Sequence, residues 1–265
     1  MHRFYLPEAD NQGSELVLSG SEARHALSVL RLRKGASVIV LDGHGHEFHC
    51  ELTEHDRRVA RLKVVQRIAV DRVPVRITLV QGILKNRTME IVVQKSTELG
   101  AEAIVPIQCD RSVSQIDGED SVSKARKWSL TAVEAIKQCG QTWLPLIEPP
   151  TGLEAYFSHR DPTPDLVLLA SLHEGARHPR SIIEAYVARH GGIPRSVEVW
   201  VGPEGDFTPH EMQAVIGRGG LPISLGPLVL RAETAALYCL SVLAYEFQTR
   251  ACGNETGVLN QVEMP

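Results

Sequence analysis

The stretch VEVWVGPEGDFTPHE, residues 197–211, determines the fold that we predict. Val197 to Val201 is an apolar run typical of a buried strand, and the glycine-bracketed loop Gly202 to Phe207 follows it directly. Thr208 and Glu211 then match a capping box, in which each side chain bonds a free N–H of the first helical turn. Strand, glycine loop and helix start in this order are typical of a parallel α/β sheet, whose ligands bind at the carboxyl ends of the strands. A tight connecting turn is the alternative interpretation of this loop.

Strands and helices alternate on both sides of this stretch. The pattern predicts further strands at 75–83, 103–107, 165–171 and 222–225, and helices at 86–99, 122–139, 179–190, 209–218 and 233–249. Strict alternation predicts a parallel sheet that is covered by helices on both faces. We therefore assign residues 75–250 to one α/β domain, followed by a polar, aperiodic tail at 251–265.

The first 72 residues have a different pattern. Short β-branched and apolar runs predict strands at 3–6, 16–19, 37–42, 47–52 and 60–68. One helix is expected between them, because Ser21 can cap it and Gly35 stops it. A small β-barrel domain with one helix, residues 1–72, fits this pattern. The segment Asp71 to Pro74 is the expected linker, since proline cannot continue a sheet ladder.

Composition limits the classes of protein that fit. At 265 residues the chain suits two domains, and its net charge of −4 permits an RNA ligand without requiring one. No apolar run is long enough to span a membrane, and the N-terminus lacks the apolar core of a signal peptide. The five cysteines are scattered without a CxxC pair. Reduced thiols and a cytoplasmic location are therefore expected.

Two further loops are predicted to meet the first one. The segment after the strand at 222–225 carries Arg231 and Glu233 to the start of the last helix. Glu233 suits a helix N-terminus, but an arginine that follows apolar residues needs a partner or a ligand. Residues 172–175 follow the strand at 165–171. Three such loops could converge on one pocket large enough for an adenosine, although the GxGxxG fingerprint of dinucleotide-binding proteins is missing.

Several motifs, in this order along the chain, resemble one family. They are Arg3-Phe-Tyr, Glu22-Ala-Arg-His25 with Val29-Leu-Arg31, the helix 84–100, Glu134-Ala-Ile-Lys-Gln-Cys-Gly140, Val201-Gly-Pro-Glu-Gly205 and the segment 225–235. Together they resemble the SPOUT-class 16S ribosomal RNA uridine-N3 methyltransferases over nearly the whole chain. The resemblance implies a SPOUT α/β domain with a parallel sheet and a C-terminal deep trefoil knot, preceded by a small PUA-like β-barrel that binds RNA.

The same resemblance implies a cofactor, a substrate and a partner. S-adenosyl-L-methionine is expected in a bent form on the knot loops 170–175, 202–207 and 225–233. The expected substrate is small-subunit ribosomal RNA, naked or in an assembled 30S subunit, and the expected assembly is a homodimer without membrane contact. The residues expected to bind the cofactor are Ala170, Leu172, His173, Val201, Gly202, Pro203, Glu204, Gly205, Leu225, Gly226, Leu230, Thr234 and Ala235.

Arg231 and Glu233 are the expected catalytic residues. Uridine N3 must lose its proton as the methyl group arrives, so negative charge develops on the flanking carbonyl oxygens. Arg231 could stabilise that charge, while Glu233 could either accept the proton or hold Arg231. The residues expected to contact RNA phosphates are Arg3, Arg24, Arg31, Arg33, Lys34, Lys85 and Arg87.

Some features depart from this picture or leave alternatives open. The family usually has Gly where this chain has Asp206, often Arg where it has Leu228, and Thr where it has Ala232. A SPOUT enzyme for another RNA, such as a ribose 2′-oxygen of transfer RNA, and a non-catalytic RNA-binding assembly factor are the alternative functions. The histidine-rich hairpin 42–49 could hold a metal, but we expect a polar turn there and no metal site.

Overall fold

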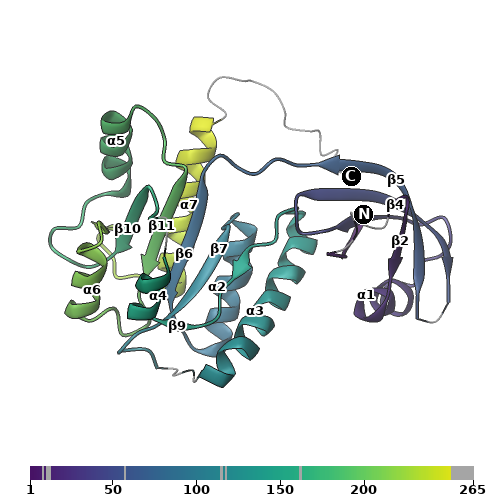
Figure 1. The fold of residues 1–265 in the computed structure, drawn as a ribbon, viewed down its shortest axis with the longest axis horizontal. Helices are drawn as coiled ribbons and strands as arrows, with labels where there is room; N and C mark the ends of the chain where they lie inside the picture. The colour runs from purple at the N-terminus through teal and green to yellow at the C-terminus, as the bar shows by residue number, and fades with distance from the viewer. Residues whose placement is uncertain are drawn as a thin grey trace.

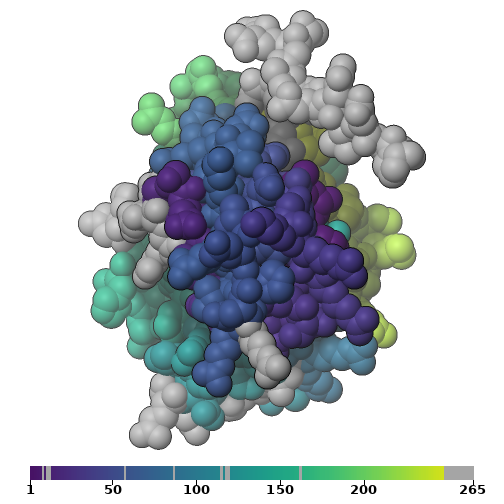
Figure 2. All heavy atoms as spheres, turned by 90° about the vertical axis from the view of Figure 1, so that its right-hand side faces the viewer, coloured from purple at the N-terminus to yellow at the C-terminus, as the bar shows by residue number. Residues whose placement is uncertain are grey.

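The structure is a computed structural model that describes residues 1–251 except 8, 10–12, 57, 114, 115, 117, 161 and 162. The predicted tail lies outside the described residues from 252 onward. Figure 1 shows two lobes joined by an extended segment between strands β5 and β6. Seen from the side in Figure 2, the nearer face is covered mostly by N-terminal residues, and the second lobe is visible around its edges.

The N-terminal lobe is built on a five-stranded sheet. Its strands are β1 (His2–Tyr5), β2 (Glu15–Leu18), β3 (Ser37–Leu41), β4 (His46–His55) and β5 (Ala60–Ala69). They follow the order β1-β3-β4-β5-β2, in which β1 and β3 are parallel and the other neighbours antiparallel. Inward side chains such as Phe4, Leu16 and Phe48 form a separate core. The predicted small β-domain is therefore present, with all five strands close to the predicted positions.

The helix between β2 and β3 is shorter and less regular than predicted. Helix α1 (Gly20–Arg24) continues as one π-helical stretch, η2 (His25–Val29), and ends well before Gly35. The amide of Leu30 bonds the carbonyl of His25 at 2.9 Å, which is the wider spacing of a π-turn. Arg31 then has a φ of 54°, a left-handed conformation that is uncommon for arginine and terminates the helix.

The C-terminal lobe is built on a seven-stranded sheet. Its strands are β6 (Arg76–Gly82), β7 (Ala103–Gln108), β8 (Leu146–Ile147), β9 (Thr151–Gly152), β10 (Leu166–Ala170), β11 (Ser196–Val201) and β12 (Leu221–Ile223). The order is β12-β10-β11-β6-β7-β8, with β9 beside β7, and every pairing is parallel. The predicted parallel sheet is therefore confirmed.

Helices cover both faces of this sheet. They are α2 (Asn86–Glu98), α3 (Gly118–Cys139), α4 (Leu153–His159), α5 (Pro179–His190), α6 (Pro209–Ile216) and α7 (Ala232–Ala251). Strand β11 shows the division, because Val197 and Val199 belong to one core and Trp200 belongs to the core on the other face. Among the described residues, no helix is both long and apolar enough to cross a membrane.

Helix α4 was not predicted, because its seven residues are too few to show helical periodicity. It covers a buried carboxylate on the central strand. The hydroxyl of Tyr156 donates to Glu198 at 2.6 Å, and a guanidinium nitrogen of Arg160 lies 2.9 Å from the same carboxylate. Burial and the negative charge of Glu198 raise the pKa of Tyr156, so the hydroxyl stays a donor. The helix and the residue after it thus add two partners to a buried carboxylate that also accepts the indole N–H of Trp200 at 2.5 Å.

Candidate active site

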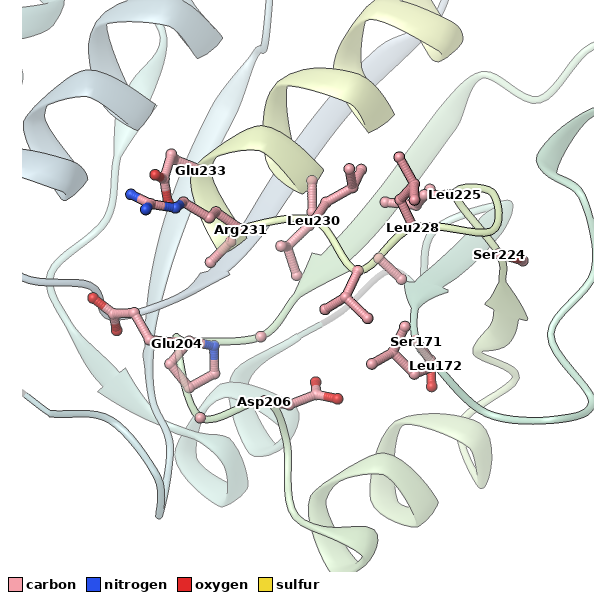
Figure 3. A pocket seen from close by; sticks show the side chains of 18 of the residues that line it. Ser171, Leu172, Glu204, Asp206, Ser224, Leu225, Leu228, Leu230, Arg231 and Glu233 are labelled. Atoms are coloured by element: carbon pink, nitrogen blue, oxygen red, sulfur yellow. The ribbon is translucent and has the colours of Figure 1, made fainter.

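The three loops that the sequence analysis singled out line one cavity of about 870 Å³. They follow β10, β11 and β12, so they leave the sheet at the carboxyl ends of neighbouring parallel strands. Figure 3 shows two kinds of flank around the cavity: Leu172, Leu225 and Leu228 lie on one side, and the charged residues Glu204 and Arg231 lie on the other.

Most of the residues that were expected to bind the cofactor line this cavity. They are Ala170, Leu172, His173, Val201, Gly202, Pro203, Glu204, Gly205, Leu225, Gly226, Leu230 and Ala235, joined by Arg231 and Glu233. Thr234 does not line the cavity, and its exposed side chain leaves the expected role a prediction. Ser171, Glu174, Asp206, Ser224 and Val229 also line the cavity; none was an individually expected site residue, although all but Ser224 lie in the loops expected to hold the cofactor. Each is a chain neighbour of a named residue, so a continuous loop was the only available signal.

The loop after β11 is held tightly against the end of β6. A side chain added at Gly82 would lie 2.5 Å from the ring and the nitrogen of Pro203. The buried side-chain amide of Gln81 donates through Nε2 to the carbonyls of Val201 and Gly202 at 3.3 and 3.2 Å. The backbone of this loop is therefore fixed from below by the neighbouring strand, which preorganises its groups for a ligand.

Arg111 holds the same loop from the other side. Its guanidinium donates to the carbonyls of Gly205 and Phe207 at 3.3 and 3.5 Å. Between them Asp206 has a φ of 59°, and its own carboxylate accepts the amide of Phe207 at 2.8 Å. Aspartate tolerates this left-handed conformation better than most residues, but glycine adopts it freely. Glycine, which the resemblance implies at this position, would adopt the same conformation without strain.

The capping box predicted at the end of this loop is confirmed. Thr208 accepts the amide of Glu211, and Glu211 accepts the amide of Thr208 at 2.7 Å. The buried carboxylate of Glu211 also accepts the amide of Asp110 at 2.9 Å, which joins the loops that follow β7 and β11. The helix start therefore fixes one end of the cavity-lining loop.

We expect Thr208→Ala to lower the free energy of unfolding by about 1 kcal/mol, because the amide of Glu211 loses its capping acceptor. Urea denaturation monitored by circular dichroism would measure this change. Thr208→Ser is the matched control and should stay close to the unsubstituted protein, since it keeps the hydroxyl. Equal stability of the two variants would show that the threonine oxygen contributes nothing to this helix.

Arg231 and Glu233 both border the cavity at the start of α7. Figure 3 shows their side chains on the same flank as Glu204. Arg231 is exposed and makes no ion pair with any side chain in the described part of the chain. A guanidinium that borders a cavity without a protein partner can bind the anionic or carbonyl oxygens of a ligand.

The residues expected to contact RNA are distributed over both lobes. Arg24, Arg33 and Lys34 are exposed, as is Arg31 in its left-handed turn. Lys85 borders the cavity, and its amide bonds Glu204 at 3.2 Å.

The remaining two differ in their surroundings. Arg87 is exposed at the start of α2. Arg3 is instead half-buried and donates to the carbonyl of Gln138 at 3.2 Å, so its side chain contacts α3.

The histidine-rich hairpin has the geometry of a polar turn. One carboxylate oxygen of Asp42 accepts the amides of His44 and His46 at 2.7 and 3.0 Å, and the other lies 2.6 Å from the ring of His46. His49 contacts Glu47 at 2.6 Å. Within the described ranges, no group of three or more His, Cys, Asp or Glu residues is placed so that it could hold a metal ion.

The fold and the cavity define a class: an α/β protein with a ligand-sized cavity on loops at the carboxyl ends of parallel strands, and with an added β-sheet lobe. Comparison with protein families is more specific. A model described as RNA methyltransferase domain matches residues 71–244, and one described as RNA methyltransferase PUA domain matches residues 18–65. The chain belongs to this family of RNA methyltransferases.

Individual relatives agree over nearly the full length. The chain is 28% identical over 252 residues to the Ribosomal RNA small subunit methyltransferase E of Bacillus subtilis, covering 93% of this chain and 97% of that protein. A methyltransferase structure from Legionella pneumophila in complex with the cofactor SAM is 31% identical, with a TM-score of 0.81 and coverage of 92% and 97%. A Ribosomal RNA small subunit methyltransferase E from Neisseria gonorrhoeae, bound to S-adenosyl methionine, is 27% identical, with a TM-score of 0.81 and coverage of 93% and 98%.

Proposed function

We propose that this protein transfers a methyl group from S-adenosylmethionine to N3 of a uridine in small-subunit ribosomal RNA. The observation that carries the proposal is the continuous similarity to the Bacillus subtilis enzyme, which includes both lobes and all three cavity loops. Similarity limited to the α/β lobe would support methyltransferase activity without indicating its substrate. The β-sheet lobe adds the part of the molecule that suits a large RNA.

The residues around the cavity fit S-adenosylmethionine. The cavity volume of about 870 Å³ is in the usual range for a cofactor site. Leu172, Leu225 and Leu230 would cover an adenine, and backbone groups at Gly202 and Gly226 would bond its edge and the ribose. When bound, this cofactor supplies an electrophilic methyl group on a positively charged sulfur. The acidic side chains of the lining, such as Asp206, suit that positive charge.

Arg231 and Glu233 would act on the base. The guanidinium of Arg231 would donate to a carbonyl oxygen beside N3 and stabilise the negative charge that develops there. A carboxylate oxygen of Glu233 would accept the N3 proton, or would hold the guanidinium in place. Lys85 borders the same cavity and would bind a phosphate of the target strand.

We infer a division of labour between residues 1–72 and 75–250. The first range would bind RNA as a PUA-like module, and the cluster Arg31 to Lys34 would contribute exposed positive charge. The second range would hold the cofactor and perform the transfer. Because basic residues of the first lobe would neutralise several RNA phosphates, the affinity for RNA is expected to fall as ionic strength rises.

The finer topology is also a proposal: we infer a trefoil knot at the C-terminal end of the second lobe. Strand β12 lies at the sheet edge, yet the following helix α7 packs on α2 and β6 nearer the middle. The loop after β10 lies against this part of the chain: the amide of Ser171 donates to Ile223 of β12, and the carbonyl of Arg177 accepts the amide of Ser224. Threading of residues 224–231 through that loop would account for this path.

A homodimer in the cytoplasm completes the proposal. Leu228 and Val229 beside the cavity and Tyr245 on α7 expose large apolar side chains, and an interface with a second copy would cover them. Burial raises the pKa of the thiols of Cys50 and Cys239 to about 12, so both stay protonated near neutral pH and are poor nucleophiles. Sedimentation equilibrium would test the dimer, since a mass near that of one chain would exclude it.

Methyl transfer to small ribosomal subunits that lack the modification tests the reaction. With labelled S-adenosylmethionine, we expect a single labelled nucleoside, N3-methyluridine, after digestion of the RNA. With transfer RNA as the substrate in a separate assay, label in a ribose 2′-O-methyl nucleoside would favour a SPOUT enzyme for another RNA. Absence of cofactor binding in calorimetry would favour a non-catalytic assembly factor. Parallel assays on naked RNA and on assembled subunits would identify the form that is methylated.

A further inference from the structure

Three motifs that resemble the family lie away from the cavity and meet between the lobes. Arg3 on β1 and Glu22 on α1 contact the C-terminal end of α3, where Glu134 to Gly140 are found. We name these contacts the seam. Figure 1 shows the end of α3 beside the strands of the N-terminal lobe, and α3 and β1 are in direct contact. None of the seam residues borders the cavity, so the proposed reaction does not by itself explain them.

Lys137 is a buried charge at the centre of the seam. Its side chain is 7% exposed, and its Nζ lies 2.9 Å from Glu22 of the N-terminal lobe and 2.8 Å from Glu134 of its own helix. Burial lowers the pKa of Lys137, but hydrogen bonds with the two glutamates outweigh it and hold the pKa above its ordinary value. The second carboxylate oxygen of Glu22 accepts the amide of Tyr5 at 3.1 Å, which fixes this glutamate to the sheet.

Arg3 makes the second contact across the seam. Its guanidinium donates to the carbonyls of Gln138 and Lys137 at 3.2 and 3.5 Å, at the end of α3 where helical carbonyls lack amide partners. A positive charge is also favoured there by the helix dipole. Gly140 has a φ of 83°, and a side chain on it would lie 3.0 Å from the guanidinium. Glycine at this position therefore leaves room for Arg3.

The linker between the lobes is fixed by the same region. The indole N–H of Trp143, three residues beyond Gly140, donates to the carbonyl of Val70 at 2.9 Å. The guanidinium of Arg72 lies 4.0 Å from the centre of the Trp143 ring and 2.7 Å from the carboxylate of Glu102. A linker held in this way gives the N-terminal lobe one orientation rather than a range.

We propose that Lys137 and Arg3 are positioning residues that hold the RNA-binding lobe at a fixed orientation to the methyl-transfer cavity. The proposal rests on the proposed function, because it assigns the seam a role in presenting RNA. An RNA bound by both lobes gains affinity from their fixed spacing, and loosening one lobe reduces that gain. Arg3 then contributes to RNA methylation through the seam rather than through a phosphate contact.

Lys137→Met tests the proposal, because methionine keeps most of the volume and removes the charge. Lys127→Met is the matched control: this lysine is on the same helix, 61% exposed and paired with Glu90. We expect Lys137→Met to raise KM for small ribosomal subunits about tenfold, as expected for lost bivalent binding. Both kcat and the Kd for S-adenosylmethionine should stay within about twofold, since the cavity is unchanged. Lys137→Arg keeps the positive charge, so its KM should stay close to that of the unsubstituted protein. Lys127→Met should also leave KM unchanged.

The rate of trypsin cleavage after Arg72 reports whether the seam holds the lobes together. Its measurement needs neither RNA nor methyltransferase activity. We expect Lys137→Met to be cleaved several times faster there than Lys127→Met, because a loosened lobe exposes the linker. Glu22→Gln is a milder variant of the same contact, in case Lys137→Met does not fold. Unchanged cleavage and unchanged KM would overturn the proposal, as would a parallel loss of cofactor affinity and thermal stability. If no RNA is methylated at all, the proposed function fails while the cleavage result still decides whether the seam holds the lobes.

Discussion

Arg231→Ala is expected to lower kcat for methylation of ribosomal RNA by about 10²–10³-fold, the loss typical when one donor to a developing negative charge is removed. The guanidinium borders the cavity, is exposed and has no ion-pair partner among the described side chains. No ion pair of the described residues is therefore lost on substitution, and we expect the fold to be retained. Single-turnover assays with labelled S-adenosylmethionine would measure the rate, with calorimetry for cofactor affinity.

Two further variants separate charge from geometry at this position. Arg231→Lys keeps a positive charge but loses the planar fork, so we expect an intermediate rate. Glu233→Gln keeps the shape of the side chain and removes its basicity. If Glu233 accepts the N3 proton, this variant should shift the pH dependence of the rate, whereas a glutamate that only holds Arg231 should lower the rate without that shift. Full turnover of Arg231→Ala would exclude Arg231 from the reaction.

The local signals in the sequence predicted much of this fold. Apolar periodicity identified the major strands of both sheets, and the Thr208 to Glu211 pattern predicted a helix start that the structure reproduces in both of its hydrogen bonds. These signals depend on residues within one turn or one strand of each other. Helix α4 lies below that length, so Tyr156 and Arg160 could not be assigned to Glu198 in advance.

Contacts between distant segments were beyond the sequence. The sequence predicts that Arg3 contacts RNA phosphates, and it gives no sign of the contact with Gln138, which joins residues 135 positions apart. The order of strands, which places β12 beside β10 and β11 beside β6, likewise has no local signal. The strand-end loops indicated that three segments could converge on one pocket, and the resemblance to a family assigned them to a cofactor, while the physical reason for the convergence lies in this strand order.

Glycines illustrate the same limit. The sequence indicates a role for the glycines of the 202–205 loop, because they bracket a turn. Gly82 stands at the end of an apolar strand, where no local signal indicates a role. In the structure Gly82 is where β6 and the cavity loop are in closest contact, and its backbone φ is one that any residue can adopt. The requirement for glycine there is purely steric, and only the positions of two segments about 120 residues apart reveal it.

Gly82→Ala is expected to abolish most cofactor binding, with the Kd for S-adenosylmethionine rising more than about tenfold, which corresponds to about 1.4 kcal/mol. The added carbon would lie 2.5 Å from both the ring and the nitrogen of Pro203 and 2.9 Å from the carbonyl carbon of Gly202. These are mainly backbone atoms of the cavity loop, and Arg111 and Gln81 hold that loop on either side, so it cannot move without losing hydrogen bonds. Overpacking of this kind also costs about 1–3 kcal/mol of stability.

Gly192→Ala is the matched control, because a side chain there meets no atom within 4 Å and the backbone φ is again ordinary. We expect it to bind S-adenosylmethionine and to unfold like the unsubstituted protein. Calorimetry and thermal unfolding on both variants would separate the effects. A Gly82→Ala protein that bound the cofactor with unchanged affinity would mean that the loop after β11 can shift freely. In that case the close contact with β6 would not be what preorganises the cavity, and the loop would have to be ordered by the ligand itself.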